Sequence, residues 1–319
     1  RWNKDLSKQW ILPLEPTEFP REIFHGSSDE LWIVVWSPAW TAHHLIRVDT
    51  RTSTIIGRYP FPHPIKETYY PVISALTIAP DSSLWMATVE GLLKLDPRTN
   101  TWREFHHNEK DPTSLPGELL YSVCMDPDDP QRYVWVGTRG QGLAKLDIST
   151  GKCRRYTTKD GLPDEVIYGI LPDARRNLWI STNMGLCRLD PRTGATRNFT
   201  KADGLSGNEF NRYGAEKSPD GRFYFAGVDG YTSFNPEDFY TDAKPSPTVI
   251  TGLRLSNKEV ATGRFTLPGE EAALLPEAIE YLSELTLPYD QRMITFTFAC
   301  MDHTAPGKNR FRYTLENFD

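Results

Sequence analysis

The sequence predicts an all-β chain in which β-propeller blades are followed by an incomplete Ig-like β-sandwich. An aromatic residue within an apolar run recurs at positions 32, 85, 135, 179 and 224, at intervals of 44 to 53 residues. A turn sequence that begins with Asp or Asn follows each of these residues. No helical periodicity of useful length separates the units, so each is expected to hold four short antiparallel strands, as a propeller blade does.

The composition agrees with a globular β protein and argues against several function classes. Nine Trp residues and 12% aromatic residues favour strands over helices. The net charge of −6, without a block of Lys or Arg, argues against a nucleic-acid partner. No run of 18 apolar residues occurs, so membrane attachment is expected only through a helix absent from this chain. Because the chain starts at Arg1 without a signal-peptide pattern, we expect a fragment or a trimmed domain.

The N-terminal part follows the repeat less regularly than the rest. Residues 8–14 (KQWILPL) are typical of the last strand of a preceding blade. In the first unit 17 residues separate the aromatic residue from its turn, whereas the last four units have 11 or 12. This difference predicts an insertion around Trp36–His44.

The unit from residue 166 to residue 200 shows the expected strands most clearly. Residues 166–171 (VIYGIL) and 178–182 (LWIST) flank a turn, PDARRN. Gly185 permits a tight reversal into LCRLD, and the PRTG that follows has Pro early and Gly late, as turns prefer. TRNFT then supplies the fourth strand.

The recurring aromatic residues are expected to be structural. A single blade cannot bury both of its faces, so large side chains must fill the gap to the next blade. We assign this role to Trp32, Trp85, Trp135, Trp179 and Tyr224. The alternative is a platform for sugar rings, which would need the rings exposed at a rim, and their position in mid-strand disfavours it.

Five blades can be recognised in residues 1–240, and the fifth lacks an evident fourth strand after YTSFN. The N-terminal segment could supply that strand and close the ring. Alternatively, the chain is an arc of a larger propeller, which is the arrangement we expect.

A second domain is expected over residues 247–319, after the linker Thr241–Pro247. Ile294, Phe296, Phe298 and Cys300 alternate with polar or small residues, so they share one face of a strand. Three or four strands in so short a segment fall below the seven of a usual sandwich, which predicts an incomplete one.

The sequence shows no catalytic constellation, and we expect no cofactor and no metal. G-x-S-x-G, H-E-x-x-H, P-loop and EF-hand sequences are absent. Neighbouring residues of a strand face opposite sides, so His43–His44 and His106–His107 are expected to be surface or turn histidines rather than chelating pairs. The four Cys form no C-x-x-C pair and are expected to be small buried side chains.

The stretch GNEFNRYG (Gly207–Gly214) is the best candidate for a ligand site. Its amide, carboxylate, guanidinium and aromatic groups suit sugar hydroxyls and stacking on a sugar ring. The candidate binding residues are Asn208, Glu209, Asn211, Arg212 and Tyr213. The alternative is that the polar side chains satisfy the backbone of a loop by local hydrogen bonds.

The repeated LW-x-(A/S)-T-x-x-GL-x-(K/R)-LDPRT pattern and the stretches DGLP (Asp160–Pro163) and DGLS (Asp203–Ser206) resemble the regulator-propeller repeats of bacterial two-component sensors. The end of the chain, from ITFTFACMD to RYTLENFD, resembles the start of the Y_Y_Y domain that follows such propellers. The resemblance implies a periplasmic sensor that dimerises through the sandwich and signals through a membrane helix to a histidine kinase, a hybrid kinase or a diguanylate cyclase. It also implies an oligosaccharide ligand. The chain departs from the family in having few blades and a short sandwich.

We therefore expect a non-catalytic sensor domain that binds an oligosaccharide or another small molecule and biases a dimer across the membrane. A propeller lyase or hydrolase is one alternative, and it requires convergent acid and base groups at the channel. A scaffold that binds a protein partner on the propeller rim is another.

Overall fold

A computed structural model describes residues 14–26, 29–37, 42–63, 72–240, 247–260, 263–264, 274–275, 277–287, 293–300, 311 and 313–314. The contacts divide the chain into unit 1, residues 1–240, and unit 2, residues 241–319. The regular elements of the described ranges are strands and short 3₁₀ helices, which confirms the all-β class. None of the helices in these ranges is long and apolar enough to cross a membrane.

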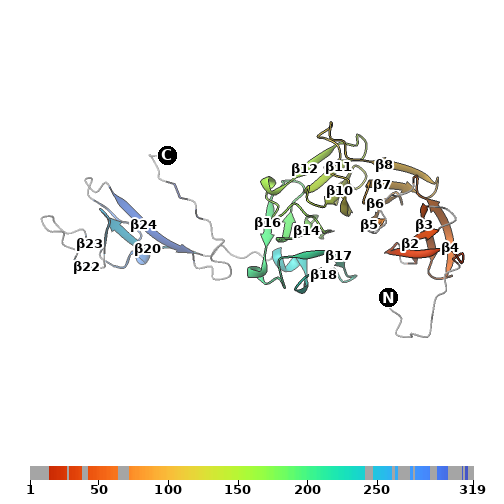
Figure 1. The fold of residues 1–319 in the computed structure, drawn as a ribbon. Coiled ribbons are helices and arrows are strands. Elements are labelled where there is room, and N and C mark those ends of the chain that lie inside the picture. The colour runs from red at the N-terminus through yellow and green to blue at the C-terminus, as the bar shows by residue number, and fades with distance from the viewer. Residues whose placement is uncertain are drawn as a thin grey trace. The chain divides into compact units, whose positions relative to one another are not determined.

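Unit 1 contains five antiparallel sheets, each built from strands that follow one another in the sequence. Figure 1 shows the sheets following one another around a common centre, from red to cyan, as propeller blades do. The first four sheets have four strands each and the fifth has three among the described residues. In chain order the sheets are β1 (Phe19–His25), β2 (Glu30–Ser37), β3 (Ala42–Asp49) and β4 (Thr54–Pro60); β5 (Ile73–Ile78), β6 (Leu84–Thr88), β7 (Gly91–Asp96) and β8 (Thr101–Phe105); β9 (Leu120–Met125), β10 (Tyr133–Thr138), β11 (Leu143–Asp147) and β12 (Cys153–Tyr156); β13 (Gly169–Pro172), β14 (Leu178–Thr182), β15 (Gly185–Leu189) and β16 (Thr196–Phe199); and β17 (Phe210–Lys217), β18 (Phe223–Gly227) and β19 (Gly230–Phe234).

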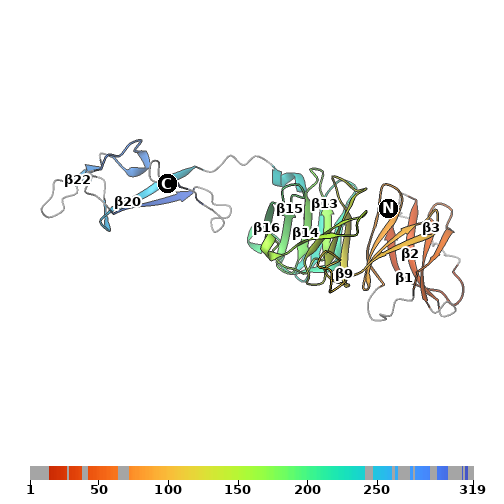
Figure 2. The ribbon, with the colours of Figure 1, turned by 90° about the horizontal axis from the view of Figure 1, so that it is seen from above.

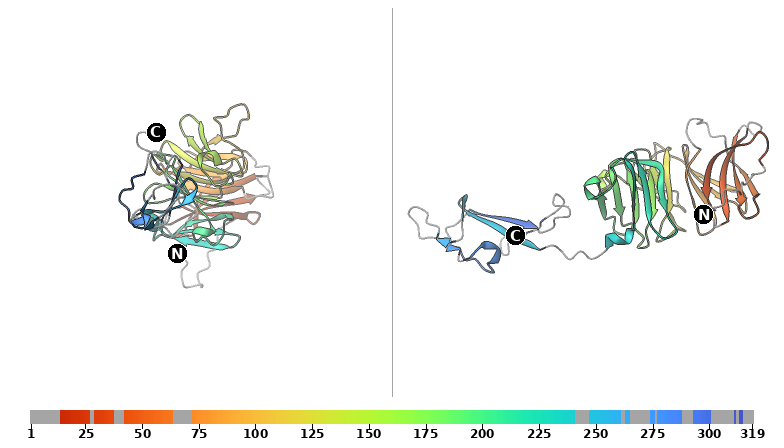
Figure 3. Two further views of the ribbon diagram at one scale, coloured as in Figure 1. Left: turned by 90° about the vertical axis from the view of Figure 1, so that its left-hand side faces the viewer. Right: turned by 90° about the horizontal axis from the view of Figure 1, so that it is seen from below.

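The first strand of each sheet is the innermost one, because residues of β1, β5, β9, β13 and β17 line one shared cavity of about 640 Å³. Figures 2 and 3 show the strands of neighbouring sheets running roughly along one direction. The strands within a sheet are antiparallel. The face on which the innermost strands begin is therefore also the face on which the fourth strands end, and the second strand of each sheet is connected to the third on this same face. We call this the start face.

Four of the five recurring aromatic residues are fully buried between sheets. Trp32, Trp85, Trp135 and Trp179 are at most 1% exposed. Each lies in an apolar cluster shared with the next sheet along the chain; Trp179, for example, packs with Phe210, Phe223 and Phe225. The gap between blades is thus filled by one Trp from each of the first four blades.

The prediction for Tyr224 is wrong. Its side chain is 36% exposed, whereas Phe223 and Phe225, on either side of it in β18, are fully buried. Side chains of a strand alternate between faces, so a shift of one residue in phase moves the aromatic anchor from Tyr224 to its neighbours.

The predicted insertion around Trp36–His44 takes the form of longer strands. β2 and β3 have eight residues each and pair continuously from Glu30 with Asp49 to Ser37 with Ala42. The extra residues therefore extend both strands of this hairpin. Residues 8–13 of the proposed closing strand lie outside the described residues.

His43 and His44 are buried on β3, which corrects the expectation of surface or turn histidines. The Nε2 atom of His44 lies 3.2 Å from a carboxylate oxygen of Glu18, which also pairs with Arg58. Burial lowers the pKa of both histidines. The contact between His44 and Glu18 helps to hold the segment before β1 against the first sheet.

The DGLP and DGLS stretches form the same capped turn in two blades. A 3₁₀ helix, η2 (Thr158–Asp160) or η3 (Lys201–Asp203), ends at a glycine with φ near +97°, a conformation that favours Gly. The carboxylate of Asp160 accepts a hydrogen bond from the Thr157 backbone, as that of Asp203 does from Thr200. The repeated sequence thus fixes the path into the next innermost strand.

Unit 2 has a small sheet in the order β21-β20-β24, with bounds β20 (Thr248–Leu255), β21 (Lys258–Glu259) and β24 (Ile294–Cys300). β22 (Gly263–Arg264), β23 (Leu274–Leu275) and the 3₁₀ helix η5 (Ile279–Tyr281) complete its described elements. Phe296 and Phe298, on the predicted apolar face of β24, are 47% and 39% exposed. The described part of unit 2 holds this three-stranded sheet and a two-stranded sheet of β22 and β23, and the Ig-like sandwich stays a prediction.

Candidate ligand-binding site

The predicted GNEFNRYG stretch leads into β17, at the start face of the fifth blade. Asn208 forms hydrogen bonds with the backbone of neighbouring loops. Its side-chain oxygen accepts one from the Lys201 backbone N–H at 2.7 Å, and its backbone carbonyl accepts one from the Gly185 N–H at 2.7 Å. The backbone carbonyl of Glu209 accepts a hydrogen bond from Val228. Asn208, Glu209 and Asn211 expose their side chains.

Arg212 and Tyr213 lie on a bulge of β17. Phe210 pairs with Gly227 and Ala215 pairs with Phe225, so the segment between them is longer on β17 than on β18. Tyr213 has a φ of +61°, in the left-handed region that few non-glycine residues adopt. Bulges re-aim side chains beside functional sites, and this one directs Arg212 and Tyr213 toward the first strands of other blades.

Arg212 joins Tyr213 to two stacked tyrosines from other blades. Tyr121 of β9 and Tyr168, just before β13, stack with their ring centroids 5.8 Å apart and their planes at 8°. The guanidinium carbon of Arg212 lies 4.8 Å from the centre of the Tyr121 ring and 5.6 Å from that of Tyr213. Tyr121, Tyr168 and Tyr213 all line the central cavity. We call these four residues the channel ring.

Hydroxyl groups of the channel ring face further polar groups. Tyr168 donates a hydrogen bond to the Asn183 side chain at 2.9 Å. Partial burial raises the pKa of Tyr213, Glu22 raises it further, and Arg212 and Ser74 lower it. The phenol of Tyr213 is therefore protonated at neutral pH, and its 57% exposed side chain can both stack and donate a hydrogen bond.

Glu22 of β1, in the first blade, lies close enough to Tyr213 to raise the pKa of its phenol. One of its carboxylate oxygens accepts a hydrogen bond from the Val72 backbone at 3.1 Å, and the other is buried without a hydrogen-bond partner among the residues that the structure describes. Burial raises the pKa of Glu22 to about 7. The carboxyl therefore changes its charge near neutral pH.

Replacing Glu22 with Gln is expected to stabilise the chain at pH 8 and to have little effect at pH 4. The pKa of Glu22 in the folded state lies above its unfolded value, so the folded state binds more protons and the wild-type protein loses stability as the pH rises from about 4.5 to 7. Urea unfolding at pH 8 should show a gain of about 1–3 kcal/mol for the variant. An equal gain at pH 4 would contradict this account.

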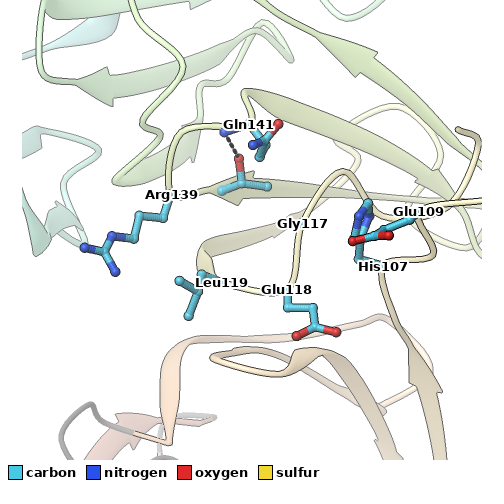
Figure 4. Close-up of a pocket in the computed structure, with 8 residues that line it drawn as sticks. His107, Glu109, Gly117, Glu118, Leu119, Arg139 and Gln141 are labelled. Atoms are coloured by element: carbon cyan, nitrogen blue, oxygen red, sulfur yellow. Dashed lines mark hydrogen bonds between the residues drawn. The ribbon is translucent and has the colours of Figure 1, made fainter.

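A second cavity of about 490 Å³ lies on the start face beside the third blade. Figure 4 shows His107 and Glu109 together on one side of this pocket, while Arg139 extends away from them on the other. Thr138 donates a hydrogen bond to the Gly142 carbonyl and accepts one from the Gln141 backbone. The ring nitrogen Nδ1 of His107 lies 2.6 Å from the Leu115 carbonyl. These hydrogen bonds stabilise the loops around the pocket. None of its described lining residues is a Phe, Tyr or Trp on which a sugar ring could stack.

The sequence analysis missed Tyr121, Tyr168 and Glu22. A signal for the tyrosines was present, because ELLY (Glu118–Tyr121) and EVIY (Glu165–Tyr168) occupy the same place before or at the start of an innermost strand. Glu22 carried no comparable signal, since its raised pKa arises from burial in the folded chain.

Comparison with known proteins supports the assignment of the repeats. Residues 161–184 match the family model described as two component regulator propeller. The histidine kinase P4 of Formosa agariphila is 24% identical over 177 residues, which cover 56% of this chain and 12% of the kinase. This chain therefore spans a small part of that relative.

Two solved structures from B. thetaiotaomicron are also similar. One is described as the extracellular domain of a hybrid two component system; it has 20% identity and a TM-score of 0.60, over 96% of this chain and 39% of that one. The other is described as the extracellular domain of a one component system, with 19% identity and a TM-score of 0.46, over 88% of this chain and 34% of that one. Residues 161–184 thus match a two component regulator propeller repeat, and the all-β fold is similar to that of the extracellular domain described for a hybrid two component system.

Proposed function

We propose that this chain is the ligand-sensing, non-catalytic part of a periplasmic domain in a bacterial two-component signalling protein. Its ligand is an oligosaccharide that binds at the channel ring. The observation that carries the proposal is the convergence of three tyrosines from three blades on one cavity of about 640 Å³, with the guanidinium group of Arg212 over the ring of one of them, Tyr121. Tyrosine rings stack on sugar rings, and phenol and guanidinium groups donate hydrogen bonds to hydroxyl or carboxylate oxygens.

Signalling follows from where these residues lie. The channel ring joins side chains of the third, fourth and fifth blades, so a bound ligand favours the arrangement of blades that holds them together. A ligand shifts a conformational equilibrium only by its difference in affinity for the two states. In the full-length protein this difference reaches the output through a homodimer, with residues 247–319 as the first part of a Y_Y_Y domain.

Replacing Arg212 with Ala is expected to weaken oligosaccharide binding by about 10- to 100-fold, the effect of losing hydrogen bonds from a charged group. Calorimetric titration of the 319-residue chain with neutral and uronate-containing oligosaccharides measures this, and product analysis of the same samples tests for turnover. Arg98→Ala, in an exposed turn where the guanidinium pairs with Asp96, is the matched control and should bind as the wild type does.

Two results would overturn the proposal. One is cleavage of the bound oligosaccharide, which would favour the lyase or hydrolase alternative. The other is equal binding by the wild type and the Arg212→Ala variant, which would place the ligand away from the channel ring.

A further inference from the structure

Three side chains that are distant in the sequence converge on the start face of the second blade. His63 follows β4, in the connection from the first blade, whereas Glu104 and His106 belong to β8 and its end. Their nearest ring nitrogens and carboxylate oxygens all lie within 4.8 Å of one another. Packing of the Phe61 ring against that of Trp102, with centroids 5.3 Å apart and the planes tilted by 43°, holds this connection beside β8. Residues 104 and 106 fall on the same side of the chain because strand side chains alternate.

One carboxylate oxygen stands between the two imidazoles. Oε2 of Glu104 lies 2.8 Å from Nε2 of His63 and 3.0 Å from Nε2 of His106. Nδ1 of His106 lies 3.0 Å from the backbone carbonyl of Glu90, which can only accept a hydrogen bond. Nδ1 of His106 therefore carries a hydrogen, and in a neutral ring Nε2 presents its lone pair to the carboxylate.

The Nε2 atoms of His63 and His106 thus lie on either side of one carboxylate oxygen, as ligand atoms of a single cation do. A divalent cation suits this group, since imidazole nitrogens and carboxylate oxygens are the usual ligands of zinc-class ions. Ligand atoms in a tetrahedral zinc site lie about 3.3 Å apart, so these half-exposed side chains need only small rotations to bind one ion.

Glu90 supplies the outer support that metal-binding histidines usually have. Its carbonyl oxygen fixes His106 through Nδ1, and its carboxylate lies 3.8 Å from Nδ1 of His63. Both histidines thus turn Nε2 toward Glu104 and Nδ1 toward Glu90. Metal-ligating histidines are oriented by such contacts of the other ring nitrogen.

We propose that His63, Glu104 and His106 form a binding site for one divalent transition-metal ion of the zinc class. Three protein ligands leave a fourth position open to water or to a further ligand at the start face. The site ties the connection from the first blade to the outer strand of the second. The expectation of no metal was based on adjacent histidine pairs, whereas this site takes one member of such a pair together with residues from other strands.

The test is calorimetric titration of the untagged, chelator-treated 319-residue chain with zinc chloride. One equivalent of zinc should bind, and excess chelator should remove it. The absence of a stoichiometric zinc site would overturn the proposal.

Variants distinguish zinc binding at this site from non-specific zinc binding elsewhere on the chain. His106→Ala should raise the Kd for zinc by at least about 100-fold. His107→Ala is the matched control, because this neighbouring histidine contacts the Leu115 carbonyl instead, and its Kd should equal that of the wild type. Glu104→Gln keeps the shape of the side chain and should weaken zinc binding by at least about 10-fold without unfolding the chain. Equal losses in the His106 and His107 variants would overturn the assignment.

Discussion

Replacing Trp179 with Ala is expected to lower the free energy of unfolding of unit 1 by about 3–5 kcal/mol, the loss that follows removal of a fully buried Trp. Its ring contacts those of Phe199, Phe234 and Phe239, with centroids 4.8 to 5.2 Å away. Its Nε1 also donates a hydrogen bond to Asp173 at 2.9 Å. The substitution opens a cavity between the fourth and fifth blades and leaves a buried carboxylate short of a donor.

Tyr224→Ala is the matched control, because Tyr224 occupies the equivalent position in the repeat but is 36% exposed. Removal of the Tyr224 side chain should lower the free energy of unfolding by less than about 1 kcal/mol. Urea unfolding followed by tryptophan fluorescence and by circular dichroism measures both variants. Equal losses at the two positions would contradict the assignment of the aromatic anchor to Phe223 and Phe225 in the fifth blade.

Replacing Asp126 with Ala is expected to destabilise unit 1 by about 2–4 kcal/mol, as loss of a buried, paired carboxylate does. Asp126 is 1% exposed. It accepts a hydrogen bond from Nε1 of Trp135 at 2.8 Å and pairs with Nζ of Lys145 at 2.7 Å. Its other oxygen accepts two backbone hydrogen bonds from the turn that follows. The substitution leaves the indole and the ammonium group without this partner.

The pH dependence of this loss has a definite sign. Burial opposes ionisation of Asp126, but hydrogen bonds from Lys145, the Asp129 backbone and Trp135 outweigh it and hold the pKa below its usual range. A lowered folded pKa stabilises the folded state above the unfolded value of 3.8, and this contribution is lost as the pH falls through the folded pKa. The difference between wild type and variant should therefore shrink below about pH 4.

Asp81 offers the matched control for Asp126. It occupies the corresponding turn of the second blade, but it is half exposed and no hydrogen bond joins it to Nε1 of Trp85. Asp81→Ala should cost about 1 kcal/mol or less. If both substitutions cost the same, the buried Trp135–Asp126 contact is not what stabilises the third blade.

The repeats predicted most of unit 1, because one blade cannot bury its own faces and each copy must therefore repeat the same anchors and turns. The four Trp anchors followed from spacing, and the reversal at Gly185 followed from the conformational freedom of glycine. Among the described residues the fifth sheet has three strands, in agreement with the lack of an evident fourth strand after YTSFN. The role of Tyr224 was wrongly predicted because it was inferred from the position of the residue in the repeat. The alternation of buried and exposed side chains along β18 is shifted by one residue, so Phe223 and Phe225 are buried instead.

The candidate sites were less predictable, because they depend on contacts between blades. The Gly207–Gly214 stretch pointed to Arg212 and Tyr213, yet their partners Tyr121 and Tyr168 lie in other repeats, and the bulge that turns them inward has no sequence signature. The convergence of His63, Glu104 and His106 likewise arises only when the first connection folds onto β8. Burial, which sets the pKa of Glu22, cannot be read from one strand.

Hydrogen–deuterium exchange of the 319-residue chain, with and without a saturating oligosaccharide, tests the proposed sensor site most directly. We predict slower exchange in peptides that contain residues 118–121, 165–168 and 209–213, which carry the channel ring, and none of this protection in the Arg212→Ala variant. Protection confined to other parts of unit 1 or to unit 2, or an unchanged pattern in the variant, would contradict a ligand site at the channel ring.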